Sequence, residues 1–331
     1  MPRFVKIDNS LTVASPGYGA MGLAFGYGPT DDAQSKDVLR KAIEMGCTFW
    51  NTARMYGPNE KLLGEVLREG NNREKVVLTT KWGIKFGAQG MEVDGSPAFA
   101  RECLEQSTAD LGSSPDIFLL HRIDKATPVE ESMQAMDNLR REGKVKYIGL
   151  SAMSATSLRR AAKVAQVDFV EMEFSPFETS IETNGVLDAC KELNVKVIAY
   201  SPLGGGFLTG RFRDFQSVTG PGDVRSSGRF PRFNEDVWQH NFRLVEALEQ
   251  IAARKGITAG QLSLAWVMQV HGDLIIPIPG TKSLKYLEQN FAAGDITPTS
   301  EEMAAVRQAI DENPLKGDKY SEEMKAFVDE D

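Results

Sequence analysis

The chain has 331 residues, of which 41% are hydrophobic and 25% are charged, a composition typical of a globular enzyme rather than of a disordered or fibrous chain. Its net charge of −8 leaves no basic face for a phosphate backbone, so no nucleic-acid partner is expected. The first ten residues lack an apolar signal core, and no run of about 18 apolar residues could span a bilayer. We therefore expect no membrane association and a cytosolic location.

Cysteine and histidine usage argues against a disulfide or metal framework. Cys47, Cys103 and Cys190 are odd in number and far apart, and each lies in an apolar or helical pattern, so reduced core thiols are expected. The three histidines have no metal-ligand spacing with one another or with a cysteine pair. No structural zinc is expected.

Short apolar runs alternate with amphipathic segments of helical period along most of the chain. A hairpin comes first, with strands at 4–7 and 11–15 across Asp8-Asn9-Ser10. The strand candidates that follow are Tyr18–Met21, Thr48–Trp50, Val76–Thr80, Ile117–Leu120, Tyr147–Leu150, Phe169–Phe174, Lys196–Tyr200 and Leu274–Ile278. The helical segments between and after them are 31–46, 60–70, 99–112, 128–144, 155–165, 184–194, 259–269 and 283–291.

Eight strands separated by single crossover helices predict an α/β fold with a closed parallel barrel, the (β/α)8 TIM barrel of typically ~250 residues. The alternative of two doubly wound domains fits the single alternation less well. We expect one barrel domain over 1–331, with an N-terminal β-hairpin and extra C-terminal helices. Its further additions are a Gly/Arg/Ser-rich loop at 210–233, a helix around 237–255 and a tail beyond residue 300. The long loop is a lid candidate.

Polar residues follow the predicted strands at the ends where barrel enzymes place their reacting groups. The second strand ends at Asn51 and leads to Tyr56, the third ends at Lys81 and the fourth at His121. Each residue alone is more often a packing, solvated or structural one. Together, a tyrosine, a cation and an imidazole can protonate a carbonyl oxygen. We expect the cation to lower the tyrosine pKa from about 10 toward working pH.

Two glycine-containing segments late in the chain are candidates for binding phosphate. Residues 17–22 match GxGxxG, but the following segment contains more glycine and a proline, so no helix starts before about Asp31 and this match is not a dinucleotide fingerprint. Segments 202–206 and 280–283 instead follow strands seven and eight, where barrels commonly bind phosphate. Ser283 is also a candidate helix N-cap, which is compatible with phosphate binding.

These residues resemble the aldo-keto reductase family from about Pro16 to Ile310. The family pattern is a strand-end acid, a Tyr-Gly pair four to five residues later, a lysine on strand three and a histidine on strand four. Asn51, Tyr56-Gly57, Lys81 and His121 meet it, with asparagine in place of the usual aspartate. The resemblance implies a catalytic set of Asn51, Tyr56, Lys81 and His121, in which Tyr56 donates a proton and His121 orients the carbonyl oxygen.

The resemblance also implies NADPH as the cofactor, extended across the barrel rim. Its nicotinamide would lie beside Tyr56 and stack on Tyr200, with the carboxamide held by Ser151 and Glu171. Glu171 replaces the usual glutamine and adds negative charge there, and Ala152 stands where asparagine is usual. The implied cofactor residues are Met21, Gly22, Ser151, Glu171, Tyr200, Ser201, Pro202, Leu203, Gly205, Leu208, Arg211, Gly280, Thr281, Lys282, Tyr286, Gln289 and Asn290. Lys282 would face the adenosine 2′-phosphate.

Within the family, FWN…YG together with segment 170–185 is similar to the fungal pyridoxal reductase group, whose members also carry the asparagine. The resemblance implies a small-molecule carbonyl substrate, first pyridoxal reduced to pyridoxine, with a fungal secondary-metabolite aldehyde or ketone as the alternative. A redox-sensing NADPH-binding protein resembling potassium-channel β subunits is a second class, and a barrel lyase or isomerase without nicotinamide is a third. The retained Tyr56, Lys81 and His121 favour turnover. The sequence does not give an oligomeric state.

Asn51 sets an expectation about charge. It can orient Lys81 by accepting a hydrogen bond through its carbonyl, but it leaves the lysine charge uncompensated by that neighbour. Either the ammonium is retained and depresses the tyrosine pKa further, or desolvation lowers the lysine pKa until it acts as a neutral relay. We favour the ammonium. On this view Asn51→Asp keeps the fold and raises the apparent tyrosine pKa.

Overall fold

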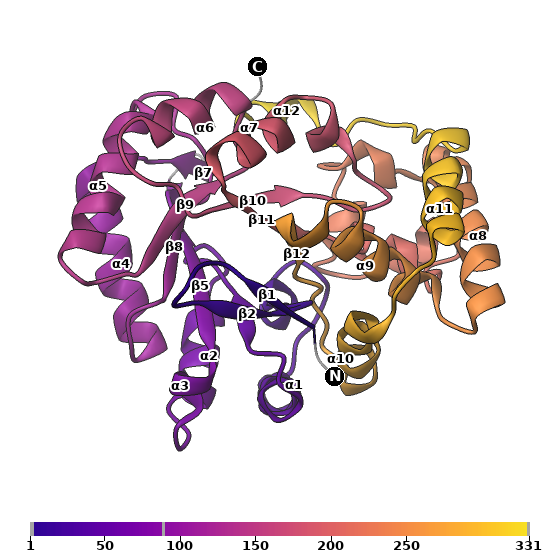
Figure 1. Cartoon of the computed structure of the whole chain (residues 1–331), viewed down its shortest axis with the longest axis horizontal. Coiled ribbons are helices and arrows are strands. Elements are labelled where there is room, and N and C mark those ends of the chain that lie inside the picture. Colours follow the sequence, from indigo (N-terminus) through magenta and orange to yellow (C-terminus); the bar gives the residue numbers. More distant parts are fainter. Residues whose placement is uncertain (1–2, 88–89, 330–331) are drawn as a thin grey trace.

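The computed structural model describes residues 3–87 and 90–329, and its centre is a sheet of eight parallel strands curled into a barrel (Figure 1). In sheet order the strands are β12 (Ile275–Pro277), β11 (Lys196–Tyr200), β10 (Phe169–Glu173), β9 (Tyr147–Ser151), β8 (Ile117–Leu120), β5 (Val77–Trp82), β4 (Phe49–Asn51) and β3 (Tyr18–Gly19). The predicted (β/α)8 barrel is confirmed. All eight strand candidates coincide with these strands, with small shifts at their ends.

Glycine makes the seam between the first and last strands possible. The backbone N–H groups of Gly17 and Gly19 donate to the carbonyls of Pro277 and Pro279, at 2.9 and 3.2 Å. A Cβ at Gly19 would lie 2.6 Å from the Ile278 carbonyl oxygen, and one at Gly280 would lie 2.6 Å from the Gly19 oxygen. The backbones can approach this closely because neither position carries a side chain. The GxGxxG segment therefore closes the barrel.

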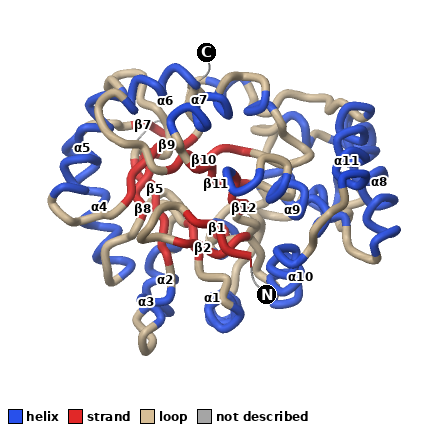
Figure 2. The backbone as a smooth tube through the Cα atoms, viewed as in Figure 1, coloured by secondary structure: helices blue, strands red, loops and turns tan. Residues whose placement is uncertain are grey.

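Helices surround the strands, as Figure 2 shows with the strands in red and the helices in blue. They are α1 (Asp32–Met45), α2 (Asn59–Leu67), α3 (Asn72–Lys75), α4 (Pro97–Leu111), α5 (Val129–Arg141), α6 (Ala155–Ala162), α7 (Val186–Leu193), α8 (Glu235–Lys255), α9 (Ala259–Gln269), α10 (Leu284–Ala292), α11 (Ser300–Glu312) and α12 (Glu322–Lys325). Helix α1 begins after an Asp31 cap whose side chain accepts from Gln34 N. This start agrees with the prediction.

Two hairpins stand outside the barrel sheet. The predicted N-terminal hairpin is present as β1 (Arg3–Lys6) and β2 (Thr12–Ser15). A second one, β6 (Ile84–Gly87) paired with β7 (Gly90–Val93), was not predicted. Alternation of Ile84 and Phe86 with polar residues was its only sequence signal. It extends the loop after β5, at the same barrel end as the polar residues that follow the strands.

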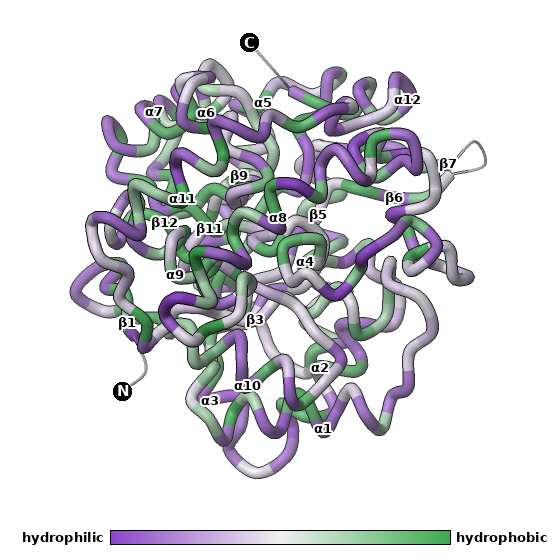
Figure 3. The backbone as a smooth tube through the Cα atoms, turned by 90° about the vertical axis from the view of Figure 1, so that its right-hand side faces the viewer, coloured by the Kyte–Doolittle hydropathy of each residue, from purple (hydrophilic) through white to green (hydrophobic). Residues whose placement is uncertain are grey.

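The core has an inner and an outer part. Inside the barrel, Phe49, Ile117, Phe169 and other strand residues form one buried cluster with Val5 and Val13 of the hairpin, so the hairpin closes the barrel at the end where the strands begin. A larger cluster lies between the strands and the helices. Figure 3 shows apolar segments toward the middle of the molecule and polar ones toward its outside. Cys47, Cys103 and Cys190 are buried with free thiols, as predicted.

None of the described helices combines the length and apolarity needed to cross a membrane. The predicted C-terminal additions are present as α8, α11 and α12. Short 3-10 turns occupy much of the 210–233 loop, at Phe215–Val218, Val224–Ser226 and Pro231–Phe233.

Candidate functional site

Three side chains on three different strands meet inside the C-terminal end of the barrel. Lys81 Nζ donates to Asn51 Oδ1 at 2.6 Å and lies 3.0 Å from Glu171 Oε1 and 3.2 Å from Glu171 Oε2. Asn51 Nδ2 donates to Glu171 Oε2 at 2.7 Å. Side chains alternate along a strand, so Glu171 faces the same side as Phe169, which belongs to the inner core. The expected hydrogen bond from Lys81 to Asn51 is confirmed.

Asn51 itself leaves the Lys81 charge uncompensated, as expected, but a carboxylate on another strand balances that charge. Lys81, Asn51 and Glu171 are only 1%, 3% and 3% exposed, and the Glu171 carboxylate lies against the ammonium at ion-pair distance. Asparagine at position 51 therefore does not leave the lysine alone, because the anion comes from β10. Burial lowers the pKa of Lys81, while Glu171 opposes that shift. The three acceptor oxygens around Nζ are satisfied by an ammonium, which agrees with the favoured charged state.

Tyr56 and His121 lie beside this group. The Tyr56 and His121 rings are 5.9 Å apart and meet edge to face at 86°, and Lys81 Nζ lies 5.5 Å from the centre of the Tyr56 ring. Phe25 stacks on Tyr56 with centroids 6.1 Å apart. Tyr56 and His121 are each 8% exposed. The structure thus brings together all four residues predicted as catalytic.

The predicted direction of the Tyr56 pKa shift is wrong. Burial raises the Tyr56 pKa well above its ordinary value, and the negative charge of Glu171 adds to the rise. Arg122 opposes it. The charge of Lys81 alone predicts a lowered Tyr56 pKa, but burial and the nearby Glu171 carboxylate raise it. Tyr56 is therefore held as the neutral phenol at neutral pH, which is the form that can donate a proton.

His121 is held neutral. Burial lowers the His121 pKa well below its ordinary value, with Lys81 and then Arg122 adding to the shift. Its Nδ1 is buried and has no hydrogen-bond partner among the described residues. A neutral imidazole has one N–H donor and one acceptor, so His121 can donate a hydrogen bond to an oxygen placed near Tyr56.

Arg122 and two tyrosines complete the rim next to Tyr56, and sequence reasoning missed two of the three. The Tyr200 hydroxyl lies 3.1 Å from the Tyr320 hydroxyl. Arg122 follows His121 and donates from Nη1 to the His121 carbonyl oxygen at 3.2 Å, and its guanidinium lies within electrostatic reach of Tyr320 and Tyr200. Adjacency to His121 could have identified Arg122. No pattern marks Tyr320, because its position depends on the tail returning to the rim.

Comparisons with known proteins identify the family of this chain. Residues 17–311 match the model of the Aldo/keto reductase family. The chain belongs to this family. An aldo-keto reductase of Gibberella moniliformis is 40% identical over 94% of this chain and 95% of its own length. The aldo-keto reductase yakc [NADP(+)] of Schizosaccharomyces pombe is 39% identical over 95% of this chain and 93% of its own length.

A solved structure supports the fold. The glycerol dehydrogenase AKR11B4 from Gluconobacter oxydans has a TM-score of 0.81, 22% identity and coverage of 94% of this chain and 96% of its own. Family membership makes the chain an oxidoreductase, and the family generally uses NADP(H). The individual cofactor contacts stay predictions.

The loops after β11 and β12 have the form of a phosphate cradle. Gly204, Gly205 and Gly206 all have positive φ values, 56°, 61° and 90°, a backbone conformation that residues with side chains rarely adopt. Ser283 is the N-cap of α10, as predicted, but its side chain makes no capping bond. The first N–H groups of α10 are therefore not capped by that side chain. This arrangement fits a cofactor phosphate.

Cations and aromatic rings predicted to hold the adenosine end gather beside this cradle. The Arg211 guanidinium lies 5.5 Å from the Tyr286 ring centre. Lys282 Nζ donates to the carbonyls of Tyr27 and Pro29 at 2.7 and 2.8 Å. An ammonium has three N–H donors, so Lys282 keeps one for a phosphate oxygen. Gln289 and Asn290 are half-buried near the end of α10.

Fewer polar groups are available where the nicotinamide of the cofactor is predicted to bind. Ser151 is buried at the end of β9 and pairs in register with Glu171. Ala152 has a positive φ of 48° and offers no polar side chain. Glu171 already accepts from Asn51 and Lys81. To bind the nicotinamide carboxamide as predicted, the Glu171 carboxylate would have to accept a further hydrogen bond beside those from Asn51 and Lys81.

The 210–233 loop crosses the barrel mouth and touches the loop after β3. Val224 N donates to Gly26 O at 2.9 Å, and Gly28 N donates to Gly222 O at 3.3 Å. Arg225 pairs with Asp223 at 2.6 Å and donates to Gly205 O at 3.0 Å. These contacts join the loop to the segment after β3 and to Gly205. They place it where a lid would lie, although its motion remains a prediction.

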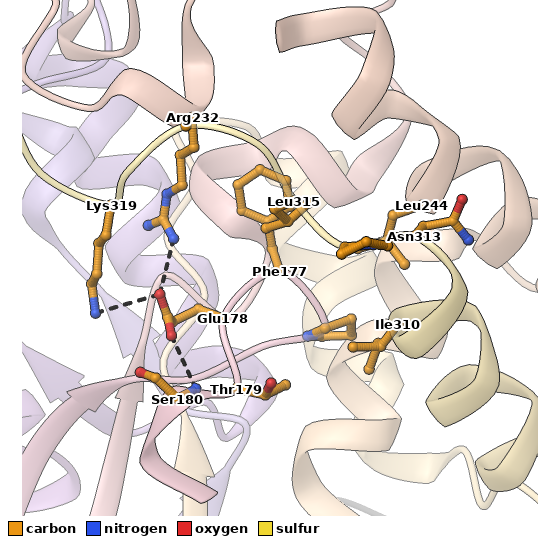
Figure 4. Close-up of a pocket in the computed structure, with 13 residues that line it drawn as sticks. Phe177, Glu178, Thr179, Ser180, Arg232, Leu244, Ile310, Asn313, Leu315 and Lys319 are labelled. Carbon is orange, nitrogen blue, oxygen red and sulfur yellow. Dashed lines mark hydrogen bonds and ion pairs between the residues drawn. The ribbon is translucent and has the colours of Figure 1, made fainter. Parts of the chain in front are cut away.

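The C-terminal tail is fastened to the rim by buried charges. Arg232 pairs with Glu173 and, at 3.2 Å, with Glu178, while Lys319 lies 3.3 Å from Glu173. Figure 4 shows Arg232 and Lys319 converging on Glu178. These residues line a cavity of about 350 Å³. None of the predicted site residues lines that cavity. The charge group holds Tyr320 next to Tyr200.

Proposed function

We propose that this chain reduces the carbonyl of an aldehyde to an alcohol with NADPH. The observation that carries the proposal is the buried Tyr56 ring, which meets the His121 ring edge to face at 5.9 Å and lies 5.5 Å from Lys81 Nζ. Bound NADPH supplies the hydride. The phosphate cradle of 204–206 and 280–283 and the cations beside it fit such a dinucleotide.

The chain's own residues account for the proton. Tyr56 donates its hydroxyl proton to the carbonyl oxygen as negative charge develops there. His121 holds that oxygen by donating a hydrogen bond. After the proton has left, the Lys81 ammonium lies close enough to favour the Tyr56 phenolate. Before the reaction, Glu171 balances the charge of Lys81.

The direct test is the loss of NADPH absorbance when the purified protein is mixed with a panel of aldehydes. We propose pyridoxal as the first member, with aromatic and aliphatic aldehydes beside it. Steady oxidation of NADPH with formation of the alcohol would support reduction. Quenching of tryptophan fluorescence by NADPH without any turnover would instead support a redox-sensing binding protein, which shares the cofactor but not the reaction.

Lys282 is predicted to set the preference for NADPH over NADH. Lys282→Ala removes one charge-assisted contact to the 2′-phosphate, worth about 1.5–3 kcal/mol, and should reduce the preference for NADPH roughly ten- to a hundredfold. Dissociation constants of both cofactors from fluorescence titration measure this. Lys285→Ala is the matched control on the exposed side of α10. Equal affinity of the unmodified protein for both cofactors would contradict the assignment.

Arg122 suggests a substrate that carries a negative charge. Its guanidinium lies within electrostatic reach of Tyr56, Tyr200 and Tyr320, and its side-chain hydrogen bond goes to the neutral carbonyl of His121 rather than to a carboxylate. A carboxylate or phenolate on the substrate would supply that partner. The ring hydroxyl of pyridoxal is acidic enough to serve.

A matched pair of aldehydes tests this role. Arg122→Met should lower kcat/KM for 4-carboxybenzaldehyde by about ten- to a hundredfold, the usual worth of a hydrogen bond to a charged group, and lower it much less for benzaldehyde. Arg122→Lys should recover part of the difference because it keeps the charge. Equal losses of kcat/KM for both aldehydes would show that Arg122 has a structural role and does not bind the charged group of the substrate.

A further inference from the structure

We propose that Glu171 is the positioning anion of Lys81 and that Asn51 must be an amide to join them, so that positions 51 and 171 share a single negative charge. The negative charge that balances Lys81 then lies at Glu171 on β10 and not at position 51, at the end of β4. It rests on the proposed function only for its kinetic readout. The pairing itself can be tested on the folded protein without a substrate.

The contacts show why the amide is required. Asn51 uses both ends of its side chain, with Oδ1 accepting from Lys81 Nζ at 2.6 Å and Nδ2 donating to Glu171 Oε2 at 2.7 Å. A carboxylate has no N–H donor. At position 51 it would set an oxygen against the Glu171 oxygen where a donor now lies. Two buried carboxylates this close cannot both remain ionised at little cost.

No other anion among the described residues can take the place of Glu171 beside Lys81. The charged or titratable groups that face the pair from neighbouring elements are Tyr56 after β4 and His121 and Arg122 after β8. Glu173, on the same strand, already pairs with Arg232 and Lys319. Among the described residues, Glu171 is therefore the carboxylate that balances Lys81.

The arrangement predicts that the two positions tolerate exchange only together. Asn51→Asp gives two carboxylates and one lysine, whereas Glu171→Gln leaves Lys81 buried without an anion. In Asn51→Asp/Glu171→Gln the single negative charge returns to the other side of the ammonium. The new glutamine can then donate to the aspartate, so the hydrogen bonds are mirrored.

The experiment compares these three variants with the unmodified protein by thermal unfolding from pH 5 to pH 8 and by the pH profile of kcat/KM. We expect each single variant to lose about 5 °C or more in Tm at pH 8, as for a broken buried ion pair, and about tenfold or more in kcat/KM. The double variant should recover at least half of both losses. If a single variant does not fold, folding of the double variant is the rescue.

The pH dependence adds a second signature. In Asn51→Asp one of the two carboxylates binds a proton in the folded protein that the unfolded chain binds only at lower pH. The stability deficit of this variant is therefore largest at high pH and shrinks as the pH falls. A purely steric defect would give a deficit that does not depend on pH in this way.

A matched control keeps the same chemical change away from Lys81. Asn59 is also buried and bonds through both ends of its amide, to Thr52 and to Ala20 O. Asn59→Asp should give no rescue of Glu171→Gln. Additive losses in Asn51→Asp/Glu171→Gln would overturn the proposal. Rescue of Tm in a protein that reduces no carbonyl would uphold the pairing and reject only the proposed function.

Discussion

Replacement of Tyr56 by phenylalanine is expected to lower kcat for aldehyde reduction by about two to four orders of magnitude, the usual worth of a positioned acid. The ring contacts with Phe25 and His121 can be kept, so NADPH affinity should stay near that of the unmodified protein. Single-turnover kinetics and fluorescence titration measure the two quantities separately.

Tyr147→Phe provides the control for this substitution. Tyr147 bonds to Asp8 and Ser10 at the hairpin end of the barrel, so the same loss of a hydroxyl there should leave kcat unchanged. Turnover near normal in Tyr56→Phe would assign the proton to His121 or to water.

The Tyr56 pKa also predicts the pH dependence of the reaction. Burial and Glu171 raise that pKa, so the phenol remains protonated past the ordinary tyrosine value of about 10. Loss of the acid should therefore not limit kcat/KM below that pH. An alkaline limb near neutrality that disappears in Tyr56→Phe would show that Tyr56 ionises far more easily than its surroundings indicate.

The sequence predicted the barrel because each strand is a short apolar run bounded by helical periods. The same pattern located the rim, since residues that follow parallel strands meet at one end of a barrel. Asn51, Lys81 and His121 could be assigned to that rim without knowledge of any distance. The lid candidate followed from the length and composition of 210–233 alone.

Charge balance inside the barrel could not be predicted in the same way. Glu171 and Asn51 lie on strands that are not neighbours in the sheet, so their contact depends on barrel closure and strand tilt. The sequence also carries no measure of burial, which reverses the expected shift of the Tyr56 pKa. Tyr320 and Lys319 reach the rim only because Arg232, Glu173 and Glu178 hold the tail.

Lys81→Met is expected to be the most destabilising of the single substitutions at the site. It removes the ammonium and leaves the Glu171 carboxylate buried with only Asn51 as a donor. Breaking a buried ion pair typically costs about 3–5 kcal/mol, which for a protein of this size corresponds to a fall of roughly 4–7 °C in Tm. Thermal unfolding at pH 8 measures it.

The second substitution in this test separates loss of the pair from loss of lysine packing. In Lys81→Met/Glu171→Gln no buried charge remains, so most of the stability should return while carbonyl reduction stays low. In Lys81→Met alone the folded protein relieves the unpaired carboxylate by binding a proton that the unfolded chain does not yet hold. Its deficit should therefore shrink as the pH falls from 8 to 5.

Lys146→Met is the control for the loss of an ion pair with lysine, because Lys146 pairs with Asp116 at 2.9 Å with 74% of its side chain exposed. Exposed pairs contribute only about 0–1 kcal/mol, so this variant should change Tm little. If Lys81→Met is as mild as Lys146→Met, or if the double variant is no more stable than Lys81→Met, then the Glu171 carboxylate is not held ionised by Lys81. In that case the neutral-relay state of the lysine would have to replace the ion pair.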